Sequence, residues 1–229
     1  MRRTIGLALV AALGVTALRA ADNALTTAEQ NQGYTLLFDG KDTAGWLLKG
    51  EKPLPSTCVQ DGALNPHFPN SGGLVYTKAV YGNFVLSCDF KVSKGCNSGI
   101  FLRVGNPRDE VQTGLEIQVL DSAGKARVGK HDCGALYDAQ APTKNAMKPA
   151  GEWNHIEITA DKSMVRVVLN GEPIVTADLD KYTEPHKNTD GSKNKYDKPL
   201  KDFPREGHIG LQDHGGDVWY KNIKIRALN

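Results

Sequence analysis

The stretch Gly114-Leu-Glu-Ile-Gln-Val-Leu-Asp121 decides the fold of this chain, because its apolar and polar residues alternate strictly. Such alternation predicts a β-strand that turns its apolar side chains to a core and turns Glu116 and Gln118 to the opposite face. Asp121 adds a second carboxylate just past the strand. The polar face either meets water, as in many half-buried antiparallel strands, or holds catalytic or sugar-binding groups on a rigid support.

Short segments of the same kind recur along the chain, separated by Gly, Asn, Asp and Pro. The expected strands span residues 36–38, 57–60, 73–77, 84–91, 98–104, 115–120, 153–160, 164–169, 174–177, 208–212 and 218–226. Asn170-Gly171 joins two β-rich runs, which is the strongest short hairpin signal. Because no helical crossover separates the strands, the pattern predicts an all-β sandwich of antiparallel sheets. Residues 26–32 suggest one short helix, with Thr27 as its cap.

Residues 1–20 have the pattern of a secretory signal peptide. Arg2 and Arg3 precede an apolar run that ends at Leu18, and small residues follow it. The run is shorter than the ~18 to 20 apolar residues that span a membrane. We therefore expect cleavage after Ala20, export to the periplasm or the medium of a bacterial cell, and a single domain over residues 21–229.

Charge and cysteine content limit the partners and the stabilising bonds. The chain has 28 basic and 26 acidic residues, so no strong field attracts nucleic acid or an anionic membrane.

Four cysteines in an exported protein suggest disulfides. Cys88 alternates with apolar residues and is expected in the core, whereas Cys96 and Cys133 lie in Gly-flanked loops and form the preferred pair. No CxxC pair is present, so a structural zinc site is not expected.

Residues 182–203 differ from the rest, because they are polar and rich in lysine, Asn, Asp and Gly. This composition predicts a long surface loop rather than a second domain. A solvated excursion is the favoured interpretation, and a wall beside a binding cleft is the alternative.

Polar faces on several strands suggest a carbohydrate site. In the strand at 98–104, Ile100, Leu102 and Val104 are expected to face the core, and Phe101 and Arg103 the other side. Placed beside the polar face of 115–120, they would supply one concave surface on which an aromatic ring stacks against a sugar and polar groups bind its hydroxyls. The residues expected on that surface are Phe101, Arg103, Glu116, Gln118 and His214.

Each of these features also has a structural interpretation. Arg103 and Glu116 can form an exposed cross-strand ion pair, worth under about 1 kcal/mol. His131 and His214 lie in Gly-rich turns, where a histidine is usually solvated. The coincidence of Arg, Glu, Gln and two His beside aligned strands favours the site.

The chain resembles the bacterial 3-keto-disaccharide hydrolase domain family. The matching stretches are 33–46, Asn97-Ser-Gly-Ile-Phe-Leu-Arg103, Gly114–Asp121, Gly134-Ala-Leu-Tyr137, Gly151-Glu-Trp-Asn154, Val168-Leu-Asn-Gly171, 207–215 and 222–225. The resemblance implies a concanavalin A-like jelly roll of two antiparallel sheets. It also implies a carbohydrate substrate, with Asn97 and Tyr137 among the residues that bind it.

The resemblance implies a keto-sugar reaction. A ketone at C3 acidifies the hydrogen on C2, so that a base can remove it, the substituent on C1 can leave, and water can add. Glu116 or His131 is the expected base, Arg103 the partner of the enolate oxygen, and His214 or Asp121 the group that serves the leaving oxygen. No cofactor is certain, but a divalent cation held by Glu116, Asp121 or His131 would replace Arg103 as the electrophile.

Two other functions remain open at this point. A non-catalytic, lectin-like domain would use the same face to bind sugar. In retaining glucanases of the implied fold, a strand with the spacing Glu-x-Asp-x-(x)-Glu carries the carboxylates. Here Gln118 stands at the position of the helper acid, which disfavours a conventional endo-β-glucanase with paired carboxyl groups ~5 to 5.5 Å apart.

Overall fold

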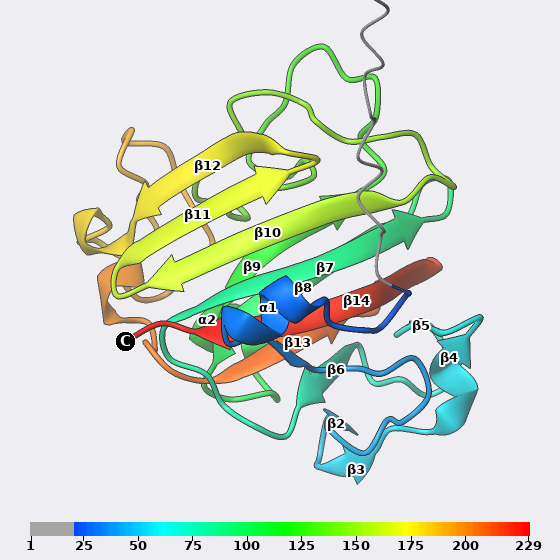
Figure 1. Ribbon diagram of the computed structural model, residues 1–229. Helices are drawn as coiled ribbons and strands as arrows, with labels where there is room; N and C mark the ends of the chain where they lie inside the picture. The colour runs from blue at the N-terminus through cyan, green and yellow to red at the C-terminus, as the bar shows by residue number, and fades with distance from the viewer. Residues whose placement is uncertain (1–20) are drawn as a thin grey trace, which may run out of the picture.

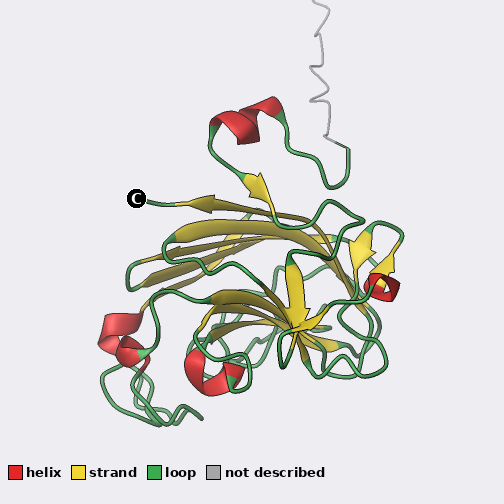
Figure 2. Ribbon diagram, turned by 90° about the horizontal axis from the view of Figure 1, so that it is seen from below, coloured by secondary structure: helices red, strands yellow, loops and turns green. Residues whose placement is uncertain are grey.

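Two antiparallel sheets lie face to face in the computed structural model, which describes residues 21–229 (Figures 1 and 2). The expected signal peptide, residues 1–20, lies outside the described residues. The larger sheet has the order β12 (Glu172–Asp178), β11 (Met164–Leu169), β10 (Asn154–Asp161), β7 (Phe84–Val92), β14 (Val218–Ala227), β5 (Ala63–Leu64) and β4 (Val59–Gln60), with β1 (Thr35–Leu36) beside β14. The smaller sheet has the order β3 (Lys52–Pro53), β2 (Trp46–Leu48), β6 (Leu74–Thr77), β13 (His208–Gln212), β8 (Asn97–Val104) and β9 (Leu115–Leu120). The predicted jelly-roll sandwich is confirmed.

The helices are short and lie outside the two layers (Figure 2). They are α1 (Thr27–Asn31), α2 (Glu110–Thr113) and the 3-10 turns η1 (Ser56–Cys58), η2 (Leu179–Lys181) and η3 (Leu200–Asp202). The helix predicted near residue 26 is present, but its cap is Thr26, because the Thr26 side chain accepts a hydrogen bond from the Glu29 backbone. Among residues 21–229 we find no helix with the length and apolar character of a membrane span.

The hairpin predicted at Asn170-Gly171 is confirmed between β11 and β12. Both turn residues have positive φ, 52° and 83°, as a tight two-residue hairpin turn requires. The sequence did not indicate β2, β3 and β5. These three strands have only two or three residues each, too few for alternation to appear.

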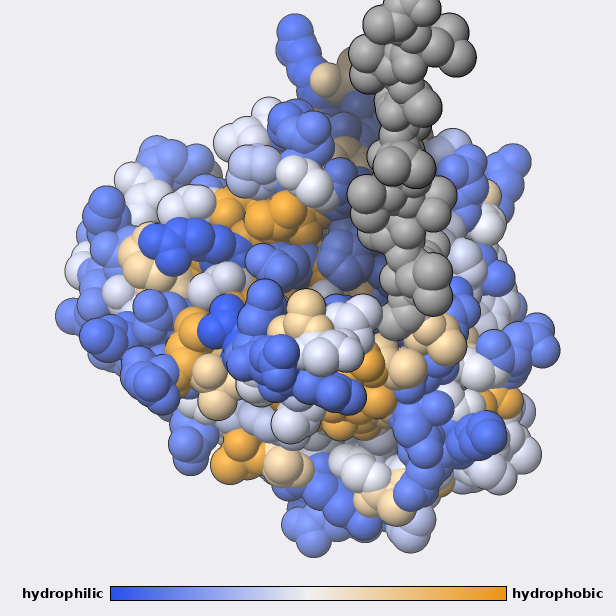
Figure 3. Space-filling model, viewed as in Figure 1, coloured by the Kyte–Doolittle hydropathy of each residue, from blue (hydrophilic) through white to orange (hydrophobic). Residues whose placement is uncertain are grey.

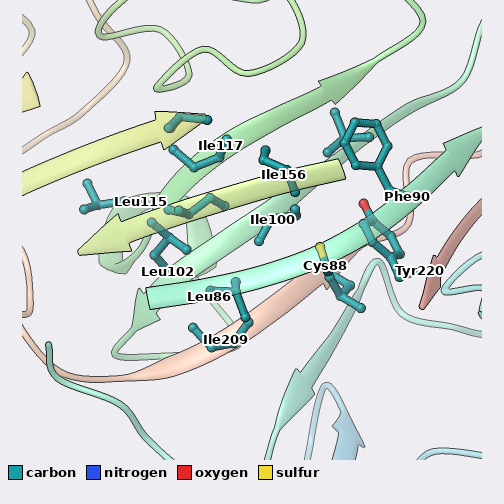
Figure 4. Close-up of a cluster of buried hydrophobic side chains, with 14 of the residues drawn as sticks. Leu86, Cys88, Phe90, Ile100, Leu102, Leu115, Ile117, Ile156, Ile209 and Tyr220 are labelled. Atoms are coloured by element: carbon teal, nitrogen blue, oxygen red, sulfur yellow. The ribbon is translucent and has the colours of Figure 1, made fainter. Parts of the chain in front are cut away.

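The core lies between the sheets, and Figure 4 shows side chains from both layers meeting there. Leu115, Ile117 and Val119 of β9 are buried in it, as the opening stretch predicts. The outward side of the larger sheet is mainly hydrophilic (Figure 3). Val80 is the one large hydrophobic residue that is exposed in the described part of the chain.

A β-bulge in β8 reverses the faces expected near its end. The pairing of β8 with β13 shifts register between His208 and Gly210, and Arg103 has a φ of 53°. An extra residue at a bulge exchanges the two faces of the strand that follows. As a result Val104 packs with Phe101 on the outer face, and Arg103 turns toward Phe84 instead. The expectation that Val104 shares the core face with Ile100 and Leu102, and that Arg103 shares the outer face, is therefore wrong.

The four cysteines are buried and free, so the expected Cys96–Cys133 bond is not formed. Both side chains pack in the main core cluster. Burial raises the pKa of the Cys96 thiol to about 11 and that of Cys133 to about 12, and thiols that remain protonated behave as small apolar groups. The prediction that Cys88 faces the core is confirmed.

Candidate functional site

A small pocket opens on the outer face of the six-stranded sheet, with a volume of about 150 Å³. Strands β8, β9 and β13 form its floor, and α2 and three loops, which carry Tyr137, Lys195 and His214, form its walls. The residues that line it are Asn97, Val111, Glu116, Gln118, Tyr137, Lys195, Gln212 and His214. Five of these, Asn97, Glu116, Gln118, Tyr137 and His214, were predicted as site residues, and the fold brings them together.

Glu116 lines this pocket from β9, with neighbouring segments on both sides. The segment that follows Gly134 runs beside β9, because the Tyr137 backbone donates to the Glu116 carbonyl at 2.9 Å. On the other side, Gly99 leaves space for the carboxylate, since a Cβ there would lie only 2.5 Å from Glu116 Oε1. The absence of a side chain at Gly99 thus positions Glu116 over β8.

The Glu116 carboxylate is 4% exposed and has an unusual acidity. Desolvation by burial raises its pKa to about 7, against an opposing effect of the nearby Lys195 ammonium. The charge of Glu110 adds a further, smaller increase. A carboxylate with such a pKa is more basic than an ordinary surface glutamate and is suited to accept a proton near neutral pH.

Lys195 supplies the positive charge of the pocket. Its Nζ lies 3.7 Å from Glu116 Oε2 and 4.0 Å from the centre of the Tyr137 ring. The Lys195 backbone donates to Asp138 Oδ2 at 2.7 Å, and the Tyr196 hydroxyl donates to the Tyr137 carbonyl at 2.6 Å. These contacts fix the ammonium beside the carboxylate.

The loop of residues 182–203 therefore forms a wall of the pocket. Tyr182, Tyr196, Leu200 and Phe203 are buried in the main core cluster, so the loop is anchored to the sandwich. The favoured prediction of a solvated excursion is wrong, and the alternative of a wall beside a cleft is correct. Nothing in the local sequence distinguished Lys195 from the other lysines of this loop, and sequence reasoning missed it.

Arg103 does not reach the pocket, which corrects its predicted roles as enolate partner and substrate contact. Its guanidinium donates to the Gly82 carbonyl at 2.7 Å, the Lys162 carbonyl at 2.8 Å and Asn83 Oδ1 at 3.1 Å. The side chain is fully buried, and desolvation lowers its pKa to about 10. It neither pairs with Glu116 nor faces solvent, because the bulge in β8 turns it away.

Phe101 is on the expected outer face but cannot serve as a stacking platform. Its side chain is completely buried in the small cluster with Leu74, Tyr76 and Val104. Leu47 and Val111 pack against this cluster. The ring therefore supports the floor of the sheet instead of contacting a ligand.

Asp121 and His131 are placed outside the pocket. Asp121 Oδ2 accepts a hydrogen bond from the Gly95 backbone at 2.9 Å, at the far end of β9. His131 hydrogen-bonds Asp138 Oδ1 at 2.9 Å, and its ring centre lies 4.8 Å from that of Tyr137, so it contacts the wall of the pocket from outside. Within residues 21–229 no three His, Cys, Asp or Glu side chains gather as a metal-binding group, and the suggested set of Glu116, Asp121 and His131 is not brought together.

Comparisons with known proteins agree with this architecture. Residues 33–226 match the model of the 3-keto-alpha-glucoside-1,2-lyase-like domain family. The chain is 31% identical over 232 residues to a 3-keto-disaccharide hydrolase from Bacteroides thetaiotaomicron, covering 86% of this chain and 79% of that protein. Two crystal structures described as putative glycosyl hydrolases from Parabacteroides distasonis are also similar. The first has a TM-score of 0.71 and 31% sequence identity, and the match covers 85% of this chain and 99% of that chain. The second has a TM-score of 0.74 and 28% sequence identity, and the match covers 91% of this chain and 100% of that chain. The chain therefore belongs to the family of 3-keto-alpha-glucoside-1,2-lyase-like domains, which are carbohydrate-active enzymes.

Proposed function

We propose that this protein hydrolyses 3-keto-glycosides by removing the C2 proton, eliminating the C1 substituent and adding water. The substrate class is supported by the family match and by the name of the 31% identical relative. The observation that carries the mechanism is the pairing of the buried Glu116 carboxylate with the partly exposed Lys195 ammonium, whose charged atoms lie 3.7 Å apart in the pocket.

In the first step, Glu116 takes the proton from C2. The electron pair of that C–H bond moves toward the C3 ketone, whose oxygen becomes an enolate. The Lys195 ammonium is the cation nearest to the base, and it donates a hydrogen bond to that oxygen. A donor placed where negative charge develops stabilises the transition state more than the ground state.

In the second step, the enolate electrons form a C1=C2 double bond and the C1–O bond breaks. The departing oxygen takes a proton from His214, which lines the pocket at its exposed side. Water then adds to C1 and returns a proton to His214. Glu116 exchanges its proton with solvent water through the open pocket and delivers one to C2. The sum of these steps is hydrolysis of the glycosidic bond, and both groups end in their starting states.

The pocket does not suit a conventional retaining glycosidase. Glu116 is the one carboxylate among its lining residues, whereas that mechanism needs two, on either side of the bond. The volume of about 150 Å³ is also below the ~300 to 1,000 Å³ of sites that enclose larger ligands. It suits a single sugar ring, with the leaving group outside. We also propose, from the pattern of residues 1–20, that the enzyme acts outside the cytoplasm.

The direct test is incubation with matched pairs of glycosides that differ only at C3. We expect methyl 3-keto-α-D-glucopyranoside and 3-keto-disaccharides to be cleaved, and the corresponding 3-hydroxy compounds to remain intact, because only the ketone acidifies C2–H. In D₂O, the keto-sugar product should carry deuterium at C2. Cleavage of the 3-hydroxy compounds at similar rates, or a product without deuterium at C2, would contradict the mechanism. Binding without cleavage would favour the lectin-like alternative.

The pH dependence should report Glu116. Its pKa of about 7 means that the carboxylate form, which is the active base, predominates only above that pH. We expect kcat/KM to rise about tenfold per pH unit below pH 6 and more slowly as the pH passes 7. Initial rates on a 3-keto-glucoside from pH 4.5 to 9 measure this. A flat profile across pH 5 to 7 would show that a group with an ordinary carboxyl pKa acts instead.

Replacing the pocket cation should lower activity and shift this profile. Lys195→Met removes a donor to the enolate, which typically costs about 10²- to 10³-fold in kcat. It also removes the charge that lowers the pKa of Glu116, so the midpoint of the profile should move to higher pH. Lys198→Met changes an exposed lysine of the same loop and is the matched control. Equal effects of the two variants would refute the role of Lys195.

A further inference from the structure

Two amide oxygens in the pocket lack hydrogen-bond partners. Among residues 21–229, four buried side-chain nitrogen or oxygen atoms are unpaired, and the two oxygens among them are Gln118 Oε1 and Gln212 Oε1. Both glutamines line the same pocket as Glu116. Gln118 is only 2% exposed, so its oxygen has no ready access to bulk water. Buried acceptors without donors are uncommon in proteins, because an unpaired buried group costs free energy.

The sheet places these two glutamines on either side of Gly99. Gly99 pairs with Gln118 of β9, and Ile100 pairs with Leu211 of β13, so that the next step in the register sets Gln212 beside Gly99. Adjacent strands lie ~4.8 Å apart, which separates the two glutamine backbones by roughly 9 to 10 Å across the strand between them. Because Gly99 has no side chain, this strip of floor is open except for the overlying Glu116 carboxylate.

The orientation of the Gln118 amide is held by a neighbour. Its Nε2 donates to Asn97 Oδ1 at 2.8 Å, which leaves Oε1 directed away from that bond. Asn97 thus acts as a positioning residue for the acceptor. A ligand that satisfies both oxygens must bring two hydrogen-bond donors. On a 3-keto-pyranose the ketone and the glycosidic oxygen have no proton to donate, and only the hydroxyl groups do.

We propose that Gln118 and Gln212 each accept a hydrogen bond from a different hydroxyl of the sugar ring, and so make the pocket specific for a ring that retains both. This inference rests on the proposed function, since it names the groups that the keto-sugar must present. Sugars that are deoxygenated or methylated at either position should be rejected. A site built to bind a hydroxyl discriminates strongly against an analogue without it, because its own polar group is then left unpaired.

The test is a set of double-mutant cycles in which the second change is made in the ligand. Binding of methyl 3-keto-α-D-glucopyranoside and of its 2-, 4- and 6-deoxy and deoxyfluoro analogues is measured by calorimetry. The protein is Glu116→Gln, which is expected to bind the sugars without cleaving them. Into this background are placed Gln118→Met, Gln212→Met, and Gln60→Met as a control, because the Gln60 amide lies on the other sheet and is already paired with Trp219.

Removal of one particular hydroxyl should weaken binding about 10- to 100-fold. Gln118→Met should weaken the parent sugar to the same degree and abolish sensitivity to that hydroxyl only, and Gln212→Met should do the same for a second hydroxyl. Fluorine carries no proton, so the deoxyfluoro sugars should bind like the deoxy sugars. For Gln212→Met the melting temperature should be unchanged or higher, since an unpaired buried oxygen is removed.

Three results would overturn the proposal. They are equal loss of affinity for all analogues in a glutamine variant, deoxyfluoro sugars that bind as tightly as the parent, and no saturable binding of the parent sugar. The proposed function is judged separately, by turnover in the wild-type protein. Specific coupling without any turnover would leave the hydroxyl contacts standing and refute the hydrolase. Turnover without coupling would refute the contacts alone.

Discussion

Glu116→Gln should lower kcat on a 3-keto-glycoside by about 10²- to 10⁴-fold, while binding of the sugar is largely retained. The change replaces the proposed base by an amide of the same shape, and a positioned proton-transfer group contributes a factor of this size. The pocket around it, including Gly99 and Tyr137, should keep its form because the volume is conserved. Steady-state rates together with calorimetric titration separate the two effects.

Asp121→Asn is the matched control for this variant. Asp121 was an alternative catalytic carboxylate, but it binds the Gly95 backbone and lies outside the pocket. Its replacement should leave kcat within a few-fold of the wild-type value. Near-wild-type turnover in Glu116→Gln, or an equal loss in Asp121→Asn, would show that the base has been assigned to the wrong residue.

Glu116→Gln should also change how the free energy of unfolding depends on pH. Because burial raises the folded-state pKa of Glu116 from 4.5 to about 7, the folded protein binds more protons than the unfolded chain between these values. The wild-type protein therefore loses about 3 kcal/mol of stability as the pH rises from about 4.5 to about 7. Glu116→Gln has no such titrating group and does not show this loss. The free energy of unfolding of the variant minus that of the wild type should therefore be larger at pH 8 than at pH 4. Urea titrations at both values measure it.

Arg103→Met should destabilise the fold strongly and leave the chemistry of the folded protein intact. The change removes the donor to the Gly82 and Lys162 carbonyls and to Asn83 Oδ1. Loss of hydrogen bonds from a buried charged group, with its acceptors left unpaired, costs about 3 kcal/mol. For a chain of this size that corresponds to a fall of about 6 to 12 °C in melting temperature.

Arg108→Met is the control for this second prediction, since Arg108 is exposed on the loop that follows β8. Arg108→Met should change the free energy of unfolding by no more than about 0.5 kcal/mol, and its melting temperature should stay close to that of the wild type. The kcat of Arg103→Met, measured well below its melting temperature, should stay near the wild-type value. A large loss of turnover at unchanged melting temperature would restore Arg103 to the catalytic role that its sequence position suggested.

Lys195 lies beside Glu116, in the place that the sequence indicated for Arg103. Alternation along β8 placed Arg103 with Glu116, but alternation holds only while a strand stays in register, and the bulge opposite Gly210 ends it. Lys195 lies 79 residues beyond Glu116 in a loop without periodicity, so no local pattern linked them. In both cases the cation that faces the carboxylate was decided by contacts between distant segments.

Local regularities were therefore sufficient for the all-β class, the hairpin at Asn170-Gly171 and the outward face of Glu116 and Gln118. Each depends on side-chain alternation or on turn geometry, which act over a few residues. Only the tertiary structure decided which cation pairs with Glu116, how its pKa is raised and which acceptors remain unpaired. These properties depend on burial and on contacts between distant segments, since Lys195 reaches Glu116 from a loop far along the chain.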